Sequence, residues 1–194
     1  MMSTYKIAII VGSLRKDSIN RKVARSLCSM AHDRLNCDMV EIGDLPLYNQ
    51  DYDADSPPEY ERFREEIASR DGVLFVSPEY NRSIPGALKN AIDVGSRPYG
   101  RSVWNQKPAA IVTASPGSIG GFGANHQIRQ ACVFLNMPVM QHPEAYLGQV
   151  NDDSFDGDGC LNDGPLKDLI GNLASAFGDW VHLIHEARGL LAAR

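Results

Sequence analysis

"YKIAIIVGSLRKDSIN" occupies residues 5–20 and joins an apolar run to a short polar loop. The apolar residues from Tyr5 to Val11 follow one another without alternation, which is typical of a strand buried on both faces. The loop after Gly12 is small, polar and basic, and apolar residues resume helical spacing after Asn20. A buried strand that passes through such a loop into a helix predicts a parallel α/β fold whose first turn exposes backbone N–H groups.

The alternation of strand and helix patterns continues along the chain. Strand-like apolar runs lie at residues 7–11, 39–42, 72–76 and 109–114, with a short one near Val139. Helical spacing fills residues 21–34, 59–70, 85–97 and 125–135, and a last apolar stripe runs from Leu166 to Ile184. This pattern predicts a flavodoxin-like three-layer α/β sandwich with a five-stranded parallel sheet in the order 2-1-3-4-5. A ligand is then expected past the carboxyl ends of strands 1, 3 and 4, where the strand order reverses.

Composition excludes several classes of protein. The 194 residues contain 24 acidic residues against 19 Lys and Arg, with no basic cluster, so a nucleic-acid partner is not expected. The four cysteines form no C-x-x-C pair and are expected as free thiols in a reducing compartment. No leader pattern opens the sequence and no apolar stretch approaches about 18 residues. We therefore expect one domain, residues 1–194, in a cytoplasmic protein without a membrane partner.

The first loop, GSLRKDSIN at residues 12–20, suits a phosphate group. Ser13, Ser18 and Asn20 supply hydroxyl and amide groups, and Arg15 supplies a cation just before a helix. Unpaired N–H groups and the helix dipole favour an anion at such a place. The alternative is that Asp17 or Ser18 only caps the helix while Arg15 is solvated. The loop lacks G-x-G-x-x-G and G-K-[ST], which disfavours a Rossmann dinucleotide site and excludes a P-loop.

The second and third loops add features of a planar ligand. In SPEYNRSIPG, residues 77–86, two prolines stiffen the chain and Asn81 offers both a donor and an acceptor to the edge of a heterocycle. In SPGSIGGFG, residues 115–123, four glycines permit the backbone to approach a flat ring. Taken singly, these loops are also compatible with an ordinary strand-to-helix turn and with plain flexibility. Their coincidence at the three predicted carboxyl ends favours a flavin mononucleotide (FMN) site.

These three loops resemble the signature loops of the NADPH-dependent FMN reductase family, close to its bacterial quinone and chromate reductases. The segments that carry the resemblance are GSLRKDSIN, SPEYNRSIPGALKNAID and TASPGSIGG, and it extends over nearly the whole chain. The resemblance implies FMN as the cofactor and NADPH or NADH as the electron donor. It implies contacts to the FMN phosphate from Ser13, Arg15, Ser18, Ile19 and Asn20, contacts to the isoalloxazine from Pro78, Glu79, Tyr80 and Asn81, and contacts to the ribityl chain and ring from Ser115, Pro116, Gly117, Gly120 and Gly121.

The resemblance also implies an activity and an assembly. The expected enzyme is an oxidoreductase that transfers hydride from NAD(P)H through FMN to quinones, free flavins or other small acceptors such as chromate, by a ping-pong mechanism. No residue is expected to serve as an obligatory acid or base, because the cofactor carries the redox chemistry. A homodimer or homotetramer is expected, with Leu88, Ile92 and parts of residues 125–135 at its interface.

Two positions depart from the family pattern. The chain has Val94, followed by Gly95, where the family often has Trp, so the packing between subunits is expected to differ. It has Arg82 where close relatives often carry an aromatic or small polar residue. Arg82 is therefore the candidate substrate residue, and a more anionic acceptor is conceivable.

Other functions are weighed against this one. A flavodoxin-like electron carrier would pass single electrons to a protein, but the T-x-T-G-x-T loop and a very acidic surface are absent from the sequence. A non-enzymatic sensor would keep the fold and bind another ligand. Residues 152–163 nearly match an EF-hand loop but end in Asp163 without an entering helix, and His182 and His185 lack a third ligand, so no metal site is expected.

Overall fold

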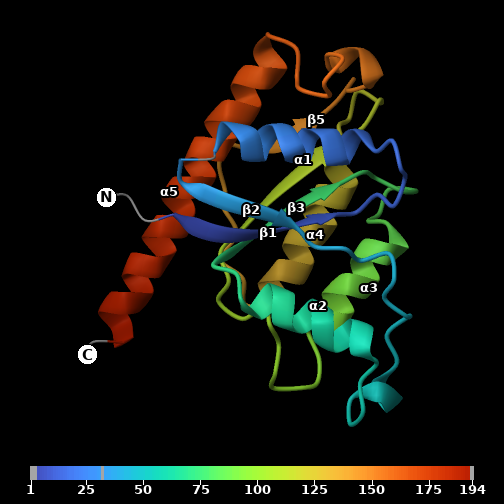
Figure 1. The fold of residues 1–194 in the computed structure, drawn as a ribbon, viewed down its shortest axis with the longest axis vertical. Coiled ribbons are helices and arrows are strands. Elements are labelled where there is room, and N and C mark those ends of the chain that lie inside the picture. Colours follow the sequence, from blue (N-terminus) through green and yellow to red (C-terminus); the bar gives the residue numbers. More distant parts are fainter. Residues whose placement is uncertain (1–3, 32, 193–194) are drawn as a thin grey trace.

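The computed structural model describes residues 4–31 and 33–192 and forms three layers around one parallel sheet (Figure 1). The strands are β1 (Tyr5–Val11), β2 (Leu35–Met39), β3 (Gly72–Ser77), β4 (Ala109–Ala114) and β5 (Ala145–Leu147). Their order is β2-β1-β3-β4-β5, and every neighbouring pair is parallel. The flavodoxin-like fold and the strand order predicted from the sequence are confirmed.

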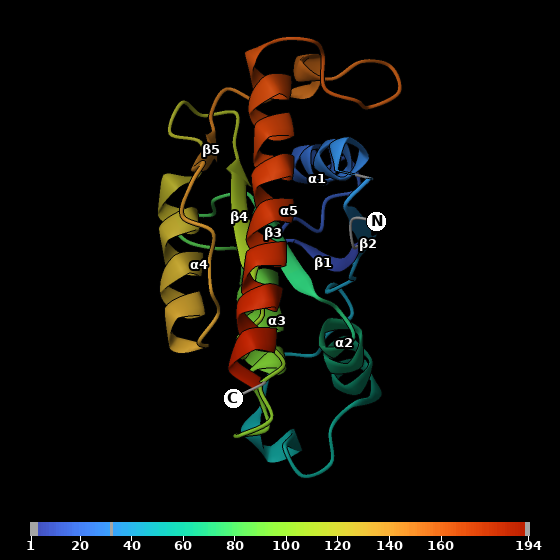
Figure 2. The ribbon, with the colours of Figure 1, turned by 90° about the vertical axis from the view of Figure 1, so that its left-hand side faces the viewer.

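Helices cover both faces of the sheet, and Figure 2 shows α5 crossing in front of the strands. α1 (Ile19–Met30) and α5 (Pro165–Ala192) lie on one face, where Leu27 and Phe177 belong to one core cluster. α2 (Pro58–Ala68), α3 (Gly86–Gly95) and α4 (Phe122–Phe134) lie on the other, over a second cluster. Two short 3-10 turns, η1 (Gln50–Tyr52) and η2 (Asp152–Ser154), complete the elements. No helix among the described residues is both long and apolar enough to cross a membrane.

The two edge strands are not where the sequence placed them. β2 occupies Leu35–Met39 rather than residues 39–42, because an edge strand leaves alternate residues such as Asn36 and Asp38 exposed and so lacks a continuous apolar run. The predicted run contributes Val40 and Ile42 to the core beyond the strand. β5 is Ala145–Leu147, whereas Val139 forms only an isolated bridge to Ala109. β5 has only three residues and directly follows Pro143 and Glu144, so it is too short to give a periodic apolar signal.

The helix boundaries move by a few residues, with identifiable causes. α1 begins at Ile19 because Ser18, in extended backbone, caps it with its side chain. α4 begins at Phe122 rather than Asn125, directly after Gly121 in left-handed backbone with φ of 75°. Such boundaries depend on cap geometry, which apolar spacing does not encode.

Leu88 and Ile92, which are expected from the sequence at a contact between subunits, pack within their own chain. Both side chains are buried within the chain, at 0% and 3% exposure, in the core cluster under α3. The large apolar side chains left exposed nearby are Val133 and Phe134 on α4 and Tyr99 after α3. An amphipathic pattern identifies a buried face, and here that face is turned to the sheet of the same chain.

The glycine at position 95 has a packing reason. A Cβ atom there would lie 2.5–2.7 Å from ring atoms of Trp104. The Trp104 ring is fully buried, and its indole N–H donates to the backbone oxygen of Ile92 at 2.9 Å. The indole therefore fills the space beside α3 that a side chain at residue 95 would need.

Replacing this glycine should destabilise the fold. We expect Gly95→Ala to lower the free energy of unfolding in urea by about 1–3 kcal/mol, because the Trp104 ring must shift within a packed core. The matched control is Gly171→Ala on α5, where the nearest atom to the new Cβ is Met30 Sδ at 3.7 Å. That change should stabilise the protein by about 0.5–1 kcal/mol through helix propensity. Equal unfolding free energies for the two variants would contradict the packing argument.

Candidate functional site

The predicted loops meet in one cavity at the carboxyl ends of β1, β3 and β4. The cavity has a volume of about 190 Å³. Its lining consists of Ser13, Arg15, Ser18, Ile19, Asn20, Pro78, Glu79, Tyr80, Ala114, Ser115 and Pro116. Sequence reasoning named all of these except Ala114, the last residue of β4, which only the strand boundary could have indicated. Asn81, Arg82, Gly117, Gly120 and Gly121 lie outside the lining.

The first loop leaves the sheet where β1 passes close to β3. Gly12 N–H donates to the Val76 oxygen at 2.9 Å, and a Cβ on Gly12 would lie 2.5 Å from Ser77 Oγ. Glycine therefore suits this close approach, because any side chain would displace the Ser77 hydroxyl.

Ser18 caps α1 and also lines the cavity. Its Oγ accepts from Arg21 N at 3.3 Å, so the capping role weighed for this residue is confirmed, while Asp17 is exposed and is not the cap. The hydroxyl keeps its own proton to donate to a ligand. The N–H groups of Ile19 and Asn20 belong to the first helical turn, whose donors have no partner within the helix. Capping and anion binding are compatible here.

Asn20 carries a buried acceptor without a partner. The side chain is 4% exposed, and its Nδ2 donates to the Ala114 oxygen at 3.2 Å, which ties α1 to β4. Its Oδ1 is buried and accepts no hydrogen bond from the residues that the structure describes. A ligand hydroxyl in this cavity would satisfy that oxygen. The donor set of the first loop and this acceptor together fit a phosphate joined to a hydroxylated chain.

The second loop is held against α4 by the Glu79 carboxylate. Glu79 Oε2 accepts from Ala124 N at 3.1 Å, and Oε1 pairs with Arg82 Nη1 at 2.9 Å. Gln127 of α4 donates to the Arg82 oxygen at 3.1 Å and accepts from Ser83 Oγ at 2.6 Å. These contacts fix the loop on the first turns of the helix.

The tip of the second loop is a two-residue hairpin. Tyr80 N–H donates to the Ser83 oxygen and Ser83 N–H to the Tyr80 oxygen, each at 2.9 Å. The backbone N–H groups of Glu79 and Asn81 donate to no atom of the described residues. Free N–H groups beside the cavity suit the acceptor edge of a planar ring.

The glycines of the third loop are explained by packing on the sheet. A Cβ on Gly120 would lie 2.5 Å from the backbone of Tyr146, and one on Gly121 would lie 2.9 Å from Thr113 Cβ. Both residues also have positive φ, 64° and 75°. Gly117 N–H donates to Ser115 Oγ at 3.0 Å. The glycines therefore press the loop against β4 and β5, so the density of glycine in this loop does not by itself require a ligand.

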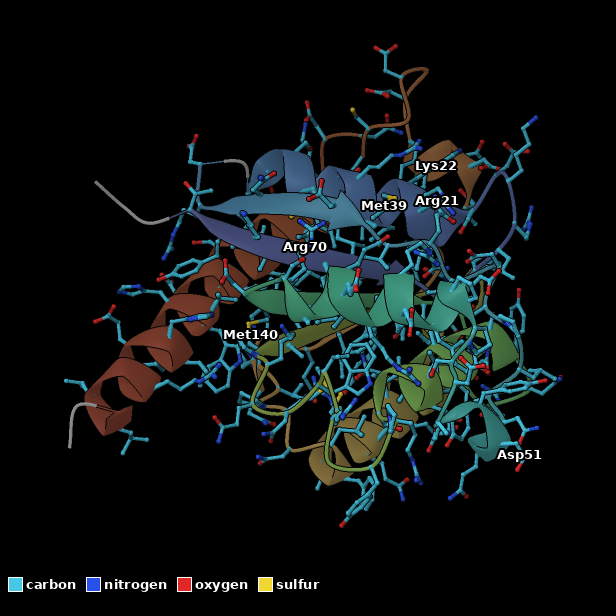
Figure 3. All side chains as sticks on the ribbon, turned by 60° about the horizontal axis from the view of Figure 1, so that its bottom comes forward. Arg21, Lys22, Met39, Asp51, Arg70 and Met140 are labelled. Atoms are coloured by element: carbon cyan, nitrogen blue, oxygen red, sulfur yellow. The ribbon has the colours of Figure 1, made fainter. Side chains whose placement is uncertain are left out.

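The turn after β5 places an acidic residue beside the first loop. Lys22 of α1 lies close to η2 (Figure 3). Its Nζ is 2.9 Å from Asp152 Oδ1. The hydrogen bond and charge of Lys22, with a smaller contribution from Arg15, hold the pKa of the Asp152 carboxyl below its ordinary value. The charge of Arg15 thus contributes to the lowered pKa of Asp152. The Arg15 side chain also lines the cavity.

A larger cavity lies elsewhere in the molecule. It has a volume of about 590 Å³ between α3 and the C-terminal part of α4, with Tyr99 and Phe134 among its lining residues. It contains none of the residues of the three loops. In the part of the chain described, no group of three or more His, Cys, Asp or Glu side chains is arranged to hold a metal ion.

Known proteins resemble this chain over most of its length. Residues 5–152 match the model of the NADPH-dependent FMN reductase family. A quinone reductase from Pseudomonas putida is 58% identical over 184 residues, 94% of this chain and 98% of the relative. A 2-hydroxy-1,4-benzoquinone reductase from a Burkholderia species is 43% identical over 176 residues, 91% of this chain and 96% of the relative.

A solved structure agrees with these relatives. The flavoenzyme FerB from Paracoccus denitrificans, an NAD(P)H:(acceptor) oxidoreductase, superposes with a TM-score of 0.88 at 40% identity. The match covers 92% of this chain and 98% of FerB.

Two glycines of the third loop should respond differently to the same change. Gly120→Ala places a methyl group against the Tyr146 backbone at positive φ, and we expect a loss of about 3 kcal/mol or more in the free energy of unfolding. Gly117→Ala meets only Ser115 Oγ at 3.4 Å and should change stability by less than about 0.5 kcal/mol. Urea unfolding measures both, and a Gly120→Ala protein as stable as the Gly117→Ala protein would refute the packing role.

Proposed function

The chain belongs to the NADPH-dependent FMN reductase family, and we propose that it transfers hydride from NAD(P)H through bound FMN to quinones. It is an oxidoreductase whose cofactors are FMN and NAD(P)H. The observation that carries the proposal is the single cavity formed by the first loop, the start of α1, the second loop and the end of β4. Free flavins and chromate are alternative acceptors within the same proposal.

We propose that the FMN phosphate lies at the start of α1. Ser13, Ser18 and Arg15 supply side-chain donors there, and Ile19 and Asn20 supply the backbone N–H groups of the first turn. Asn20 Oδ1, which lacks a partner in the described chain, accepts from a hydroxyl of the ribityl chain. Ser115, Pro116 and Gly117, with Gly120 and Gly121 behind them, border that chain on the side of β4.

The planar ring of FMN is proposed to rest against the second loop. Pro78 and Tyr80 line the cavity, and the free N–H groups of Glu79 and Asn81 face the ring edge that carries oxygen and nitrogen acceptors. Donors fixed in advance along that edge stabilise negative charge without reorganisation. The contacts of Glu79 and Gln127 with α4 keep this loop in place.

The proposed mechanism needs little from side chains. Bound FMN supplies two-electron redox chemistry, and the chain binds and orients it. Nicotinamide and acceptor use the same open face in turn, which is a ping-pong mechanism. The second loop holds the ring edge fixed throughout, and no residue acts as an obligatory acid or base.

The assembly is proposed to be a homodimer or a homotetramer of single FMN-binding domains, each comprising residues 1–194, in the cytoplasm. Phe134 of α4 and Tyr99 are 89% and 91% exposed and line the larger cavity. Exposed apolar side chains gathered at one place favour a partner subunit. Ile92, expected at the contact, also lines this cavity, whereas Leu88 is fully buried.

An anaerobic absorbance spectrum tests the function directly. The purified protein, reconstituted with FMN, should show a bound-flavin band that bleaches on addition of NAD(P)H and returns on addition of a quinone. A bound band that neither NADPH nor NADH bleaches would replace the reductase with an electron carrier. Absence of flavin binding would favour a sensor for another ligand and refute the proposal.

The phosphate site has a separate test. We expect Arg15→Gln to raise the Kd for FMN about tenfold, the effect of losing one charge-assisted hydrogen bond. Lys16→Gln is the matched control, because Lys16 is the adjacent exposed cation and does not line the cavity. Fluorescence quenching of FMN on titration with apoprotein gives both constants. Equal weakening by the two changes would indicate a general charge effect rather than a contact by Arg15.

A further inference from the structure

The tip of the second loop places an arginine in a conformation that favours glycine. Asn81 and Arg82 have φ of 53° and 64°, and the hydrogen bonds between Tyr80 and Ser83 enclose them as a two-residue hairpin turn. Turns with two left-handed residues favour Asn followed by Gly. Asn81 follows that preference and Arg82 does not. The backbone of Arg82 is therefore strained, and a strained residue that persists points to a use for its side chain.

Neighbouring contacts hold Arg82 in this conformation. Its backbone oxygen accepts from Gln127 Nε2, and a Cβ on Gly123 would lie 2.9 Å from that oxygen. Its Nη1 pairs with Glu79 Oε1, and the carboxylate of Glu79 is itself 10% exposed and lines the cavity. The guanidinium thus lies one hydrogen bond from the cavity wall.

The guanidinium retains donors that face solvent. Its side chain is 73% exposed, and Glu79 is its only side-chain partner among the described residues. Arginine carries five N–H donors in a planar fork that matches two oxygens of an anion. Glu79 is occupied on both oxygens, by Arg82 and by Ala124 N. A cation with unused donors is therefore held in place beside a cavity for a planar cofactor.

We infer that Arg82 selects acceptors of the 2-hydroxyquinone class, in their ionised form, over neutral quinones. This inference rests on the proposed quinone reductase function. A 2-hydroxyquinone is a vinylogous acid that is ionised at neutral pH. Its negative charge is shared by the oxygens on C2 and C4, and the C2 oxygen lies directly beside the carbonyl oxygen on C1. The ring can stack on the cofactor while the adjacent oxygens on C1 and C2 meet the guanidinium fork.

Reduction removes the charge that Arg82 recognises. The ionised 2-hydroxyquinone takes hydride from NAD(P)H and two protons from water, and the products are a neutral trihydroxyarene and NAD(P)⁺. Arg82 therefore attracts the substrate more strongly than the product, which favours exchange at the open face.

The test compares two acceptors that differ in one group. The ratio of kcat/KM for 2-hydroxy-1,4-naphthoquinone to that for 2-methoxy-1,4-naphthoquinone, measured anaerobically on FMN-loaded enzyme, should fall about five- to tenfold in Arg82→Gln. Each ratio is compared with wild type, so the intrinsic reactivities of the quinones cancel. Arg25→Gln removes the same charge from an exposed position of α1 and should leave the ratio unchanged. An unchanged ratio in Arg82→Gln would overturn the inference.

Binding without turnover supplies a second measurement. Calorimetric titration of oxidised, FMN-loaded enzyme with the hydroxyquinone should give a Kd about five- to tenfold higher in Arg82→Gln than in wild type. If the wild-type enzyme reduces neither quinone, the proposed function is wrong. If it reduces both and the variant keeps the same ratio and the same Kd, only the role of Arg82 is wrong.

The 2′-phosphate of NADPH is the competing anion. If Arg82 binds that phosphate, Arg82→Gln lowers the preference for NADPH over NADH and leaves the quinone ratio as in wild type. That outcome would overturn the inference in favour of a role in donor recognition.

The strain argument is tested by stability. Arg82→Gly and Arg82→Gln both remove the charge and the ion pair with Glu79, but only glycine relieves the positive φ. We expect the Tm of Arg82→Gly to exceed that of Arg82→Gln by about 2–4 °C. Equal Tm values would show that the positive φ of a non-glycine residue does not destabilise the fold at this position. The strain would then give no reason to infer a role for Arg82.

Discussion

The close passage of β1 along β3 at Gly12 is the constraint on which the site depends. A side chain there would lie 2.5 Å from Ser77 Oγ, so glycine lets the first loop leave the sheet, at the point where the strand order reverses, without displacing that hydroxyl. That exit places Ser18 at the start of α1 and brings Asn20 to the end of β4, where its amide donates to Ala114. The polar groups of the cavity are therefore positioned by the geometry of two buried strands, and the loops need little rigidity of their own.

The sequence was sufficient for the central part of the fold and for most of the cavity lining. β1, β3 and β4 are buried on both faces, so their apolar runs are continuous and easy to identify. The edge strands were misplaced because β2 alternates and β5 spans only Ala145–Leu147. Loop residues were predicted because small polar residues directly after a buried parallel strand must lie at one edge of the sheet.

Side-chain pairing and the causes of glycine could not be predicted in the same way. Glu79 reaches Ala124, 45 positions away in the chain, and no local pattern encodes that contact. The glycines at 120 and 121 were interpreted as a platform for a ligand, but Tyr146 and Thr113 occupy the space in which their side chains would lie. Gly95, which reads as a weak helix residue, accommodates the Trp104 ring. A glycine in these loops indicates that other atoms lie close to its backbone, and only the tertiary structure identifies those atoms.

Volume alone would favour a different region of the molecule from the proposed cofactor site. The cavity beside Phe134 and Tyr99 is about 590 Å³ and the cavity among the loops about 190 Å³. The smaller one contains a buried acceptor without a partner, a helix start with free N–H groups and a carboxylate held on two sides. Unmet hydrogen-bonding capacity in a buried place costs free energy that a ligand can recover, whereas an open apolar surface is satisfied by any apolar partner. The two cavities thus differ in the occupants that we propose for them, a cofactor in one and a neighbouring subunit over the other. α4 connects them, since its first turn holds Glu79 and its last turn carries Phe134.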